Sequence, residues 1–109
     1  MKKNFLSISA RQGIYPLPYK NIIRLEAKGS QTVIHDSSGN KHWYNKNIGA
    51  LKTLLRNQDS FFRVHKSHII NVNKMKVYKP NDGNVVIMEC NTSVPVSKRV
   101  RSSFNRMLK

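Results

Sequence analysis

The sequence predicts a mainly β protein with about two short helices. Turn-forming segments recur along the chain and separate short runs in which apolar and polar residues alternate, which is the pattern of half-buried strands. We expect about seven to nine such strands. With 109 residues the chain is long enough for one hydrophobic core, so we expect a single domain over residues 1–109.

Five short strands are predicted in the first part of the chain. Pro16 and Pro18 cannot donate hydrogen bonds to a sheet ladder, so the second of these strands should lie at an edge or end early. Residues 19–21 should form a corner, and Gly29 and Gly39 lie in turn sequences. The expected strands occupy residues 4–8, 14–17, 22–27, 31–35 and 41–44.

Two segments change to the spacing of a helix. The first places its apolar residues on one face and predicts an amphipathic helix over residues 47–57, with Asn45 or Asn47 as its N-cap. The second predicts a C-terminal helix that has Ser97 as its N-cap. Between the helices, further strands are expected at 75–79, 84–89 and 94–96, of which the first two are joined by an Asp-Gly turn.

Residues 61–71 form the stretch around which the rest of the chain is organised. Aromatic residues at its start and isoleucines near its end are typical core residues, whereas residues 65–68 between them have strong hydrogen-bonding groups and little reason to be buried. From Phe61 to Asn81 the sequence contains no acidic residue, although it contains five lysines and arginines. We therefore predict an exposed loop at 65–68 that binds an anion.

The whole chain is strongly basic. It has 20 lysines and arginines against 5 aspartates and glutamates, which gives a formal net charge of +15. Ten of the basic residues lie at or before Asn57 and ten lie after it. The positive charge is therefore spread along the whole chain and is not confined to a terminal tail. Such a charge is the electrostatic signature of a nucleic-acid-binding protein.

Cysteine usage and the N-terminal residues favour the cytoplasm. Cys90 has no second cysteine with which to form a disulfide, which suits a reducing compartment. Asn4, Ser7 and Ser9 interrupt the apolar run that a signal peptide would need. We therefore expect a cytoplasmic protein that is neither exported nor inserted into a membrane.

Two further basic segments have the chemistry to bind an anion. Lys98, Arg99 and Arg101 fall in the first turns of the predicted C-terminal helix, where the helix macrodipole disfavours each cation by about 0.3–1 kcal/mol. A bound phosphate would reverse the sign of this effect. Residues 28–31 form a basic turn in which the amide of Gln31 can pair with the edge of an adenine.

The residues leave two other functions open. An RNA-binding or ribosome-associated protein would also explain the net charge. The histidines would permit a metal-dependent nuclease, but Cys90 has no partner cysteine, acids are few, and positive surroundings repel a cation. We therefore expect no catalytic activity, no metal and no cofactor. The four histidines are His35, His42, His65 and His68.

Three segments of the chain together resemble the LytTR DNA-binding domain of bacterial response regulators. Residues 21–29 resemble its early strand and turn, residues 61–71 its central motif, and residues 94–99 its C-terminal signature. The resemblance implies an elongated arrangement of short antiparallel sheets. It also implies sequence-specific binding of double-stranded DNA for the regulation of transcription, with loops that enter successive major grooves of direct repeats in promoters.

The resemblance assigns roles to particular residues. The base-reading positions of the family fall on Gln31, Lys66 and Arg99. Lys66 and Arg99 have the donors to pair with guanine, whereas Gln31 suits adenine. Residues that would contact the DNA backbone or support the loops are Lys28, Ser30, Arg63, His65, Ser67, Lys98 and Arg101.

The resemblance also implies partners beyond DNA. Members of the family act as output domains of two-component systems. The chain is therefore either an excised output domain, with a receiver domain or signalling partner outside it, or a stand-alone regulator. Paired repeats would hold two protomers on one DNA site.

Overall fold

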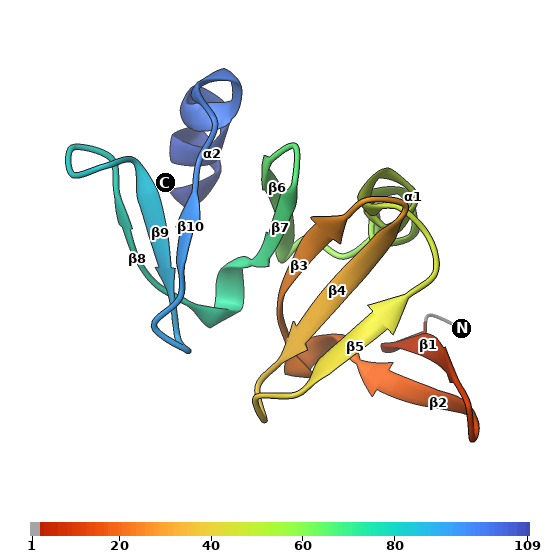
Figure 1. Cartoon of the computed structure of the whole chain (residues 1–109). Helices are drawn as coiled ribbons and strands as arrows, with labels where there is room; N and C mark the ends of the chain where they lie inside the picture. Colours follow the sequence, from red (N-terminus) through yellow and green to blue (C-terminus); the bar gives the residue numbers. More distant parts are fainter. Residues whose placement is uncertain (1–2) are drawn as a thin grey trace.

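The computed structural model describes residues 3–109 and shows ten strands, two α-helices and three short 3-10 helices within that range (Figure 1). The predicted mainly β class is therefore confirmed, and the molecule is elongated, with principal extents of 45 × 28 × 24 Å. The strands are β1 (Phe5–Ala10), β2 (Gly13–Pro18), β3 (Ile22–Lys28), β4 (Gln31–Asp36), β5 (Lys41–Tyr44), β6 (Phe61–His65), β7 (His68–Asn71), β8 (Met75–Lys79), β9 (Val85–Met88) and β10 (Ser93–Pro95). The helices are α1 (Ile48–Leu54), α2 (Arg101–Leu108), η1 (Tyr19–Asn21), η2 (Val72–Lys74) and η3 (Lys98–Val100).

A five-stranded antiparallel sheet with the order β5-β4-β3-β7-β6 forms the centre of the fold. In its register Leu25 of β3 lies opposite Ile34 of β4 and Ile69 of β7, so that all three side chains share one face. This face, the β1–β2 hairpin and α1 together bury a first core, which includes Leu6, Leu51 and the three residues of the sheet. Burial of these apolar side chains drives the packing of the hairpin and the helix onto the sheet.

The opposite face of the sheet contributes to a second core. Val64 and Ile70 of the sheet pack with the three-stranded sheet β10-β9-β8 and with α2. Phe104 of α2 is fully buried there, with ring centroids 5.2 Å from Phe62 and 4.9 Å from Tyr78. The five-stranded sheet therefore separates two apolar layers, and each layer holds one helix.

The β1–β2 hairpin forms a sheet of its own. Pro16 and Pro18 both lie in β2, where they pair with Ser7 and Phe5 across a two-stranded ladder. The expectation that these prolines mark an edge strand is confirmed, because β2 has a partner on one side only.

Both helices differ in their limits from the sequence-based expectation. The predicted helix over 47–57 is wrong in length: α1 ends at Leu54, and residues 55–57 form turns. Leu55 is nevertheless only 1% exposed. Its place in the apolar pattern therefore reflects a buried side chain and not a helical backbone. At the N-terminus the expected cap is present, because the side chain of Asn47 accepts a hydrogen bond of 2.9 Å from the backbone N–H of Ala50.

The C-terminal helix begins later than expected. Ser97 precedes the 3-10 helix η3, and α2 itself starts at Arg101. The side chain of Ser97 makes no capping hydrogen bond; its backbone carbonyl instead accepts a bond of 3.1 Å from the N–H of Val100. Lys98 and Arg99 consequently lie in the 3-10 turn and not in the first turn of the α-helix.

Asn71 is a buried polar residue that joins two strands of the central sheet. Its side chain is 2% exposed and donates a hydrogen bond of 2.8 Å to the carbonyl of Ile22 at the start of β3. The amide oxygen of Asn71 accepts a bond of 3.1 Å from the backbone N–H of Asn73 in η2. Both bonds satisfy backbone groups that would otherwise be left without a partner.

We expect Asn71→Ala to lower the free energy of unfolding by about 1–3 kcal/mol, because the buried carbonyl of Ile22 loses its donor. Urea denaturation followed by circular dichroism measures the change. Asn73→Ala is the matched control, because the Asn73 side chain is exposed and its backbone N–H remains. A free energy of unfolding within about 0.5 kcal/mol of the wild type in Asn71→Ala would contradict the assigned role.

Asp36 organises the turn between β4 and β5. One of its carboxylate oxygens accepts hydrogen bonds of 2.9 Å from the backbone N–H groups of Ser38 and Asn40, and the other is 2.7 Å from Nε2 of His42. Burial alone would raise the pKa of Asp36, but the hydrogen bonds from His42, Asn40 and Ser38 outweigh burial and hold the pKa below its usual value. The charged form is therefore stabilised by folding.

We expect Asp36→Asn to lower stability at neutral pH and to have a smaller effect in acid. Because the folded pKa lies below the unfolded value, the carboxylate contributes stability above about pH 4, and this contribution is lost as the pH falls through the folded pKa. Denaturation curves at pH 7 and pH 3 measure the difference between the wild type and the variant. A difference that grew on acidification would contradict the assignment.

Candidate nucleic-acid interface

Three basic segments lie along one side of the molecule, at the top of Figure 1. Tip 1 is the β3–β4 turn at residues 28–31, tip 2 is the β6–β7 turn at residues 65–68, and tip 3 comprises η3 with its flanks at residues 97–101. Tip 1 is a tight turn that requires the left-handed backbone of Gly29, which has φ +63°. The three segments singled out in the sequence are thus all presented at the ends of regular elements.

Tip 2 is narrower than the predicted loop at 65–68. His65, the last residue of β6, pairs across the ladder with His68, the first residue of β7, so only Lys66 and Ser67 form the turn. This pairing extends both strands up to the turn. Within residues 3–109 the structure has ten strands, one above the expected range of seven to nine. The rings of the two histidines lie 5.3 Å apart between centroids.

Side chains around tip 2 hold its backbone in place. Arg63 Nη2 donates a hydrogen bond of 2.7 Å to the carbonyl of Lys66, and the N–H of Ser67 donates a bond of 3.1 Å to Nδ1 of His65. The carbonyl of Ser67 accepts a bond of 2.9 Å from the N–H of Ala27 on β3. Arg63 and His65 therefore support the turn, while the side chain of Lys66 is exposed at its end.

Tip 3 is joined to tip 2 through β6. The N–H of Ser97 donates a hydrogen bond of 2.8 Å to the carbonyl of Val64, one residue before tip 2. Arg101 turns back toward the chain, with Nε 3.5 Å from the carbonyl of Val96. Lys98 and Arg99 are exposed.

Tips 2 and 3 enclose a shared hollow of about 330 Å³. Arg63, His65, Lys66, Ser97 and Arg99 contribute to its lining, and none of these residues is acidic. Within residues 3–109 the side chains of Lys66 and Arg99 make no ion pair and no hydrogen bond with another residue, so their charges are available to a ligand. Two of the predicted base-reading residues therefore meet in one basic hollow.

Gln31 lies apart from this pair. It is half-buried at the start of β4 and lines a second hollow of about 470 Å³, whose other residues include Trp43 and Lys46. Ser30 is exposed in the adjacent turn. The third predicted base-reading residue thus occupies a separate site on the molecule.

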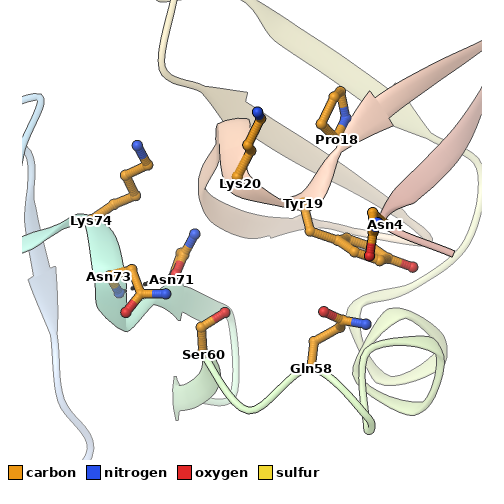
Figure 2. A pocket seen from close by; sticks show the side chains of 9 residues that line it. All are labelled: Asn4, Pro18, Tyr19, Lys20, Gln58, Ser60, Asn71, Asn73 and Lys74. Atoms are coloured by element: carbon orange, nitrogen blue, oxygen red, sulfur yellow. Dashed lines mark hydrogen bonds between the residues drawn. The ribbon is translucent and has the colours of Figure 1, made fainter. Parts of the chain in front are cut away.

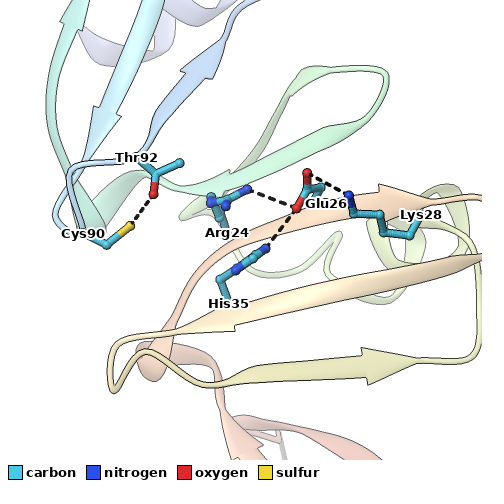
Figure 3. Close-up of polar contacts among 6 residues, drawn as sticks. All are labelled: Arg24, Glu26, Lys28, His35, Cys90 and Thr92. Carbon is cyan, nitrogen blue, oxygen red and sulfur yellow. Dashed lines mark hydrogen bonds and ion pairs between the residues drawn. The ribbon is translucent and has the colours of Figure 1, made fainter.

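Glu26 forms an acidic contact beneath tip 1 (Figure 3). Its carboxylate lies 3.6 Å from Arg24 Nη1, 3.6 Å from Lys28 Nζ and 3.1 Å from His35 Nε2. Burial tends to raise the pKa of Glu26, but the hydrogen bond from His35 and the positive charges of Arg24 and Lys28 together hold it below its usual value. Glu26 therefore stays ionised and orients Lys28, which is 52% exposed.

Sequence reasoning did not select Trp43 or Lys46 as candidate site residues. Trp43 is 53% exposed on β5 and lines the same hollow as Gln31. A lysine close to adjacent aromatic residues is a signal for nucleic-acid contact that the sequence contains, at Trp43-Tyr44 and Lys46, but Tyr44 is half-buried and packs against the first core. Exposure of the tryptophan, however, is decided by the tertiary packing.

Two of the four histidines are hydrogen-bonded to other side chains of the protein. His35 contacts Glu26, and His42 contacts Asp36 and the hydroxyl of Tyr15. Burial lowers the pKa of His35, and Arg24 adds to this effect against the opposing hydrogen bond and charge of Glu26. In the described range of 3–109, no three residues among His, Cys, Asp and Glu are grouped so as to hold a metal ion. Over the same range no helix has the length and apolar character to cross a membrane.

Comparisons with known proteins show the family to which the chain belongs. The family model for the LytTr DNA-binding domain matches residues 12–109. A solved structure described as the LytTr DNA-binding domain of a response regulator from Bacillus cereus is 28% identical, with a TM-score of 0.83 over 98% of each chain. A search of curated proteins found no match. The family match covers all three tips and the central sheet, and the chain therefore belongs to the LytTR family of DNA-binding domains.

Proposed function

We propose that this LytTR domain regulates transcription by reading double-stranded DNA through its three tips, each set into a major groove on one face of the duplex. The observation that carries the proposal is the shared hollow of tips 2 and 3, where the unpaired cations Lys66 and Arg99 meet without an acidic neighbour in the lining. A net charge of +15 supplies the sequence-independent part of the affinity. Sequence preference then depends on the side chains that reach the base edges.

Three residues read bases in this proposal. Lys66 and Arg99 donate to O6 and N7 of guanine, and Gln31 pairs with adenine through its amide. The separation of Gln31 from the other two supports a contact with a different part of the DNA site. The two hollows thus correspond to two groups of base pairs.

The remaining residues of the tips contact the DNA backbone or support the backbone of the loops. Lys28, Ser30 and Lys98 are exposed beside the base-reading residues and are placed to contact phosphates. The hydrogen bonds of Arg63, His65, Ser67 and Arg101 described above support loop positioning for these four residues.

The proposal extends to the assembly on DNA. Two protomers occupy a pair of direct repeats about one helical turn apart, so that the same face of the duplex is read twice. A receiver domain or signalling partner outside this chain controls the binding, and the protein acts in the cytoplasm without catalytic activity of its own. Selection of duplexes from a random pool, followed by sequencing of the bound fraction, tests this arrangement. Binding without any enriched repeat, or preferential binding of structured RNA in competition, would contradict it.

We expect Arg99→Ala to weaken binding to the selected site by about 1–3 kcal/mol and to have a much smaller effect on a random duplex, because a bidentate contact to guanine is lost. Fluorescence anisotropy at fixed salt measures both affinities. Arg106→Ala removes an exposed arginine from the last turn of α2 and should change neither affinity by as much. Equal losses on the two duplexes in Arg99→Ala would exclude base reading by Arg99.

We expect Lys98→Ala to weaken binding to both duplexes and to reduce the salt dependence. If about six phosphates are neutralised, the logarithm of the binding constant falls with the logarithm of salt at a slope near −5, and loss of one contact changes that slope by about one. Lys41→Ala removes the same charge at the start of β5, away from the tips, and serves as the control. An unchanged slope in Lys98→Ala would show that Lys98 makes no phosphate contact.

A further inference from the structure

A cavity of about 490 Å³ is lined by residues of η1 and η2, which lie on the side of the molecule away from the tips (Figure 1). Its walls come from Asn4, from residues 18–20, from Gln58 and Ser60 before β6, and from residues 71–74, so four regions distant in sequence meet there (Figure 2). The volume is within the range of about 300–1,000 Å³ that is usual for small-molecule sites. The polar residues that line it include Lys20, Gln58, Ser60, Asn71, Asn73 and Lys74.

The lining has the chemistry of an anion site. None of its nine residues is acidic, whereas Lys20 and Lys74 contribute two ammonium groups. Figure 2 shows both ammonium groups and the amide nitrogen of Asn71 pointing to the same side. Each ammonium group can donate charge-assisted hydrogen bonds to a carboxylate or phosphate.

Asn71 adds a fixed donor to the cavity. The residue is almost fully buried, and its amide nitrogen has two N–H groups, of which one is used in the hydrogen bond to the carbonyl of Ile22. Because both ends of the amide are held by backbone groups, the second N–H has a fixed direction. A rigid donor in the same lining as two lysines favours a ligand with defined geometry over loosely held counterions.

Tyr19 and Pro18 give one wall of the cavity an apolar surface. The ring of Tyr19 is held edge-on by Phe61, with centroids 6.2 Å apart. Burial, with a smaller contribution from Tyr44, raises the pKa of Tyr19, so its hydroxyl remains a neutral donor at physiological pH. The wall therefore suits the carbon skeleton of a small organic anion.

We propose that this basal cavity binds a small organic anion through a phosphate or carboxylate group held by Lys20, Lys74 and the amide of Asn71. The site is separate from the DNA interface, because η1 and η2 lie at the lower side of the molecule in Figure 1 and the three tips lie at the upper side. The proposal does not depend on the DNA-reading roles of the tips. It predicts binding in the absence of DNA.

A site-resolved titration tests the proposal. ¹H–¹⁵N correlation spectra of the whole chain are recorded with inorganic phosphate, a phosphomonoester (adenosine monophosphate) and a carboxylate (citrate) as separate probes, at constant ionic strength in sodium chloride. We expect at least one probe to shift the side-chain amide of Asn71 and the backbone amides of Asn73 and Lys74 saturably, with a Kd on the order of 1 mM. Comparison of the three probes identifies the preferred group.

Charge-matched variants separate the site from general attraction to a basic protein. The double variant Lys20→Met/Lys74→Met should raise the Kd measured at Asn71 by about tenfold or more, since two charge-assisted bonds are lost. Lys41→Met/Lys52→Met removes the same charge elsewhere and should leave that Kd within about twofold. Lys20→Arg/Lys74→Arg keeps the charge and should retain binding, which guards against a loss caused by misfolding.

Three results would overturn the proposal. One is the absence of saturable shifts at Asn71, Asn73 and Lys74 with all three probes. Another is an equal rise in Kd for both double Met variants, which would indicate attraction by net charge alone. The last is a response confined to the residues of tips 2 and 3, which would place the anion at the DNA interface.

Discussion

The pairing of β3 with strands on both of its sides is the interaction on which the rest of the structure depends. β3 lies at the centre of the five-stranded sheet, and its side chains enter both cores. A bulge between Ile22 and Arg24 changes the alternation, so Ile22 and Leu25 face the first core while Ile23 faces the second. Without the bulge, regular alternation would place Ile22 and Leu25 on opposite faces, and one of them would leave its core.

The same strand connects both ends of the molecule. Its C-terminal end leads into tip 1, and there the N–H of Ala27 donates a hydrogen bond to the carbonyl of Ser67 in tip 2. At its N-terminal end the carbonyl of Ile22 accepts a hydrogen bond from the side-chain amide of Asn71. Backbone pairing and a buried amide thus fix the relative positions of the tips, while the exposed cations Lys66 and Arg99 keep their rotamer freedom until a ligand orders them. A rigid backbone that presents such side chains is suited to a DNA duplex, in which the base edges repeat at a regular spacing.

Local sequence determined much of the fold, and long-range packing determined the rest. Turn chemistry at Gly29 and Gly39 and the prolines of β2 predicted the hairpins because the backbone preference resides in the residue itself. The length of α1 was missed because Leu55 is buried outside the helix, which apolar spacing does not distinguish from helical burial. The basic tips were found from charge, but their grouping into two hollows depends on the register of distant strands and could not be derived from spacing along the chain.

The central position of β3 also sets the order in which the chain can fold. Its β4 neighbour follows within a tight turn, but Leu25 pairs with Ile69 on the other side, 44 positions further along the chain. Closing this contact costs more loop entropy than closing a hairpin, and neither core is complete before it forms. During synthesis the β3 edge of the β3–β4 hairpin therefore stays unpaired until the residues of β7 have left the ribosome. Folding of this domain should be slow relative to helical domains of equal size.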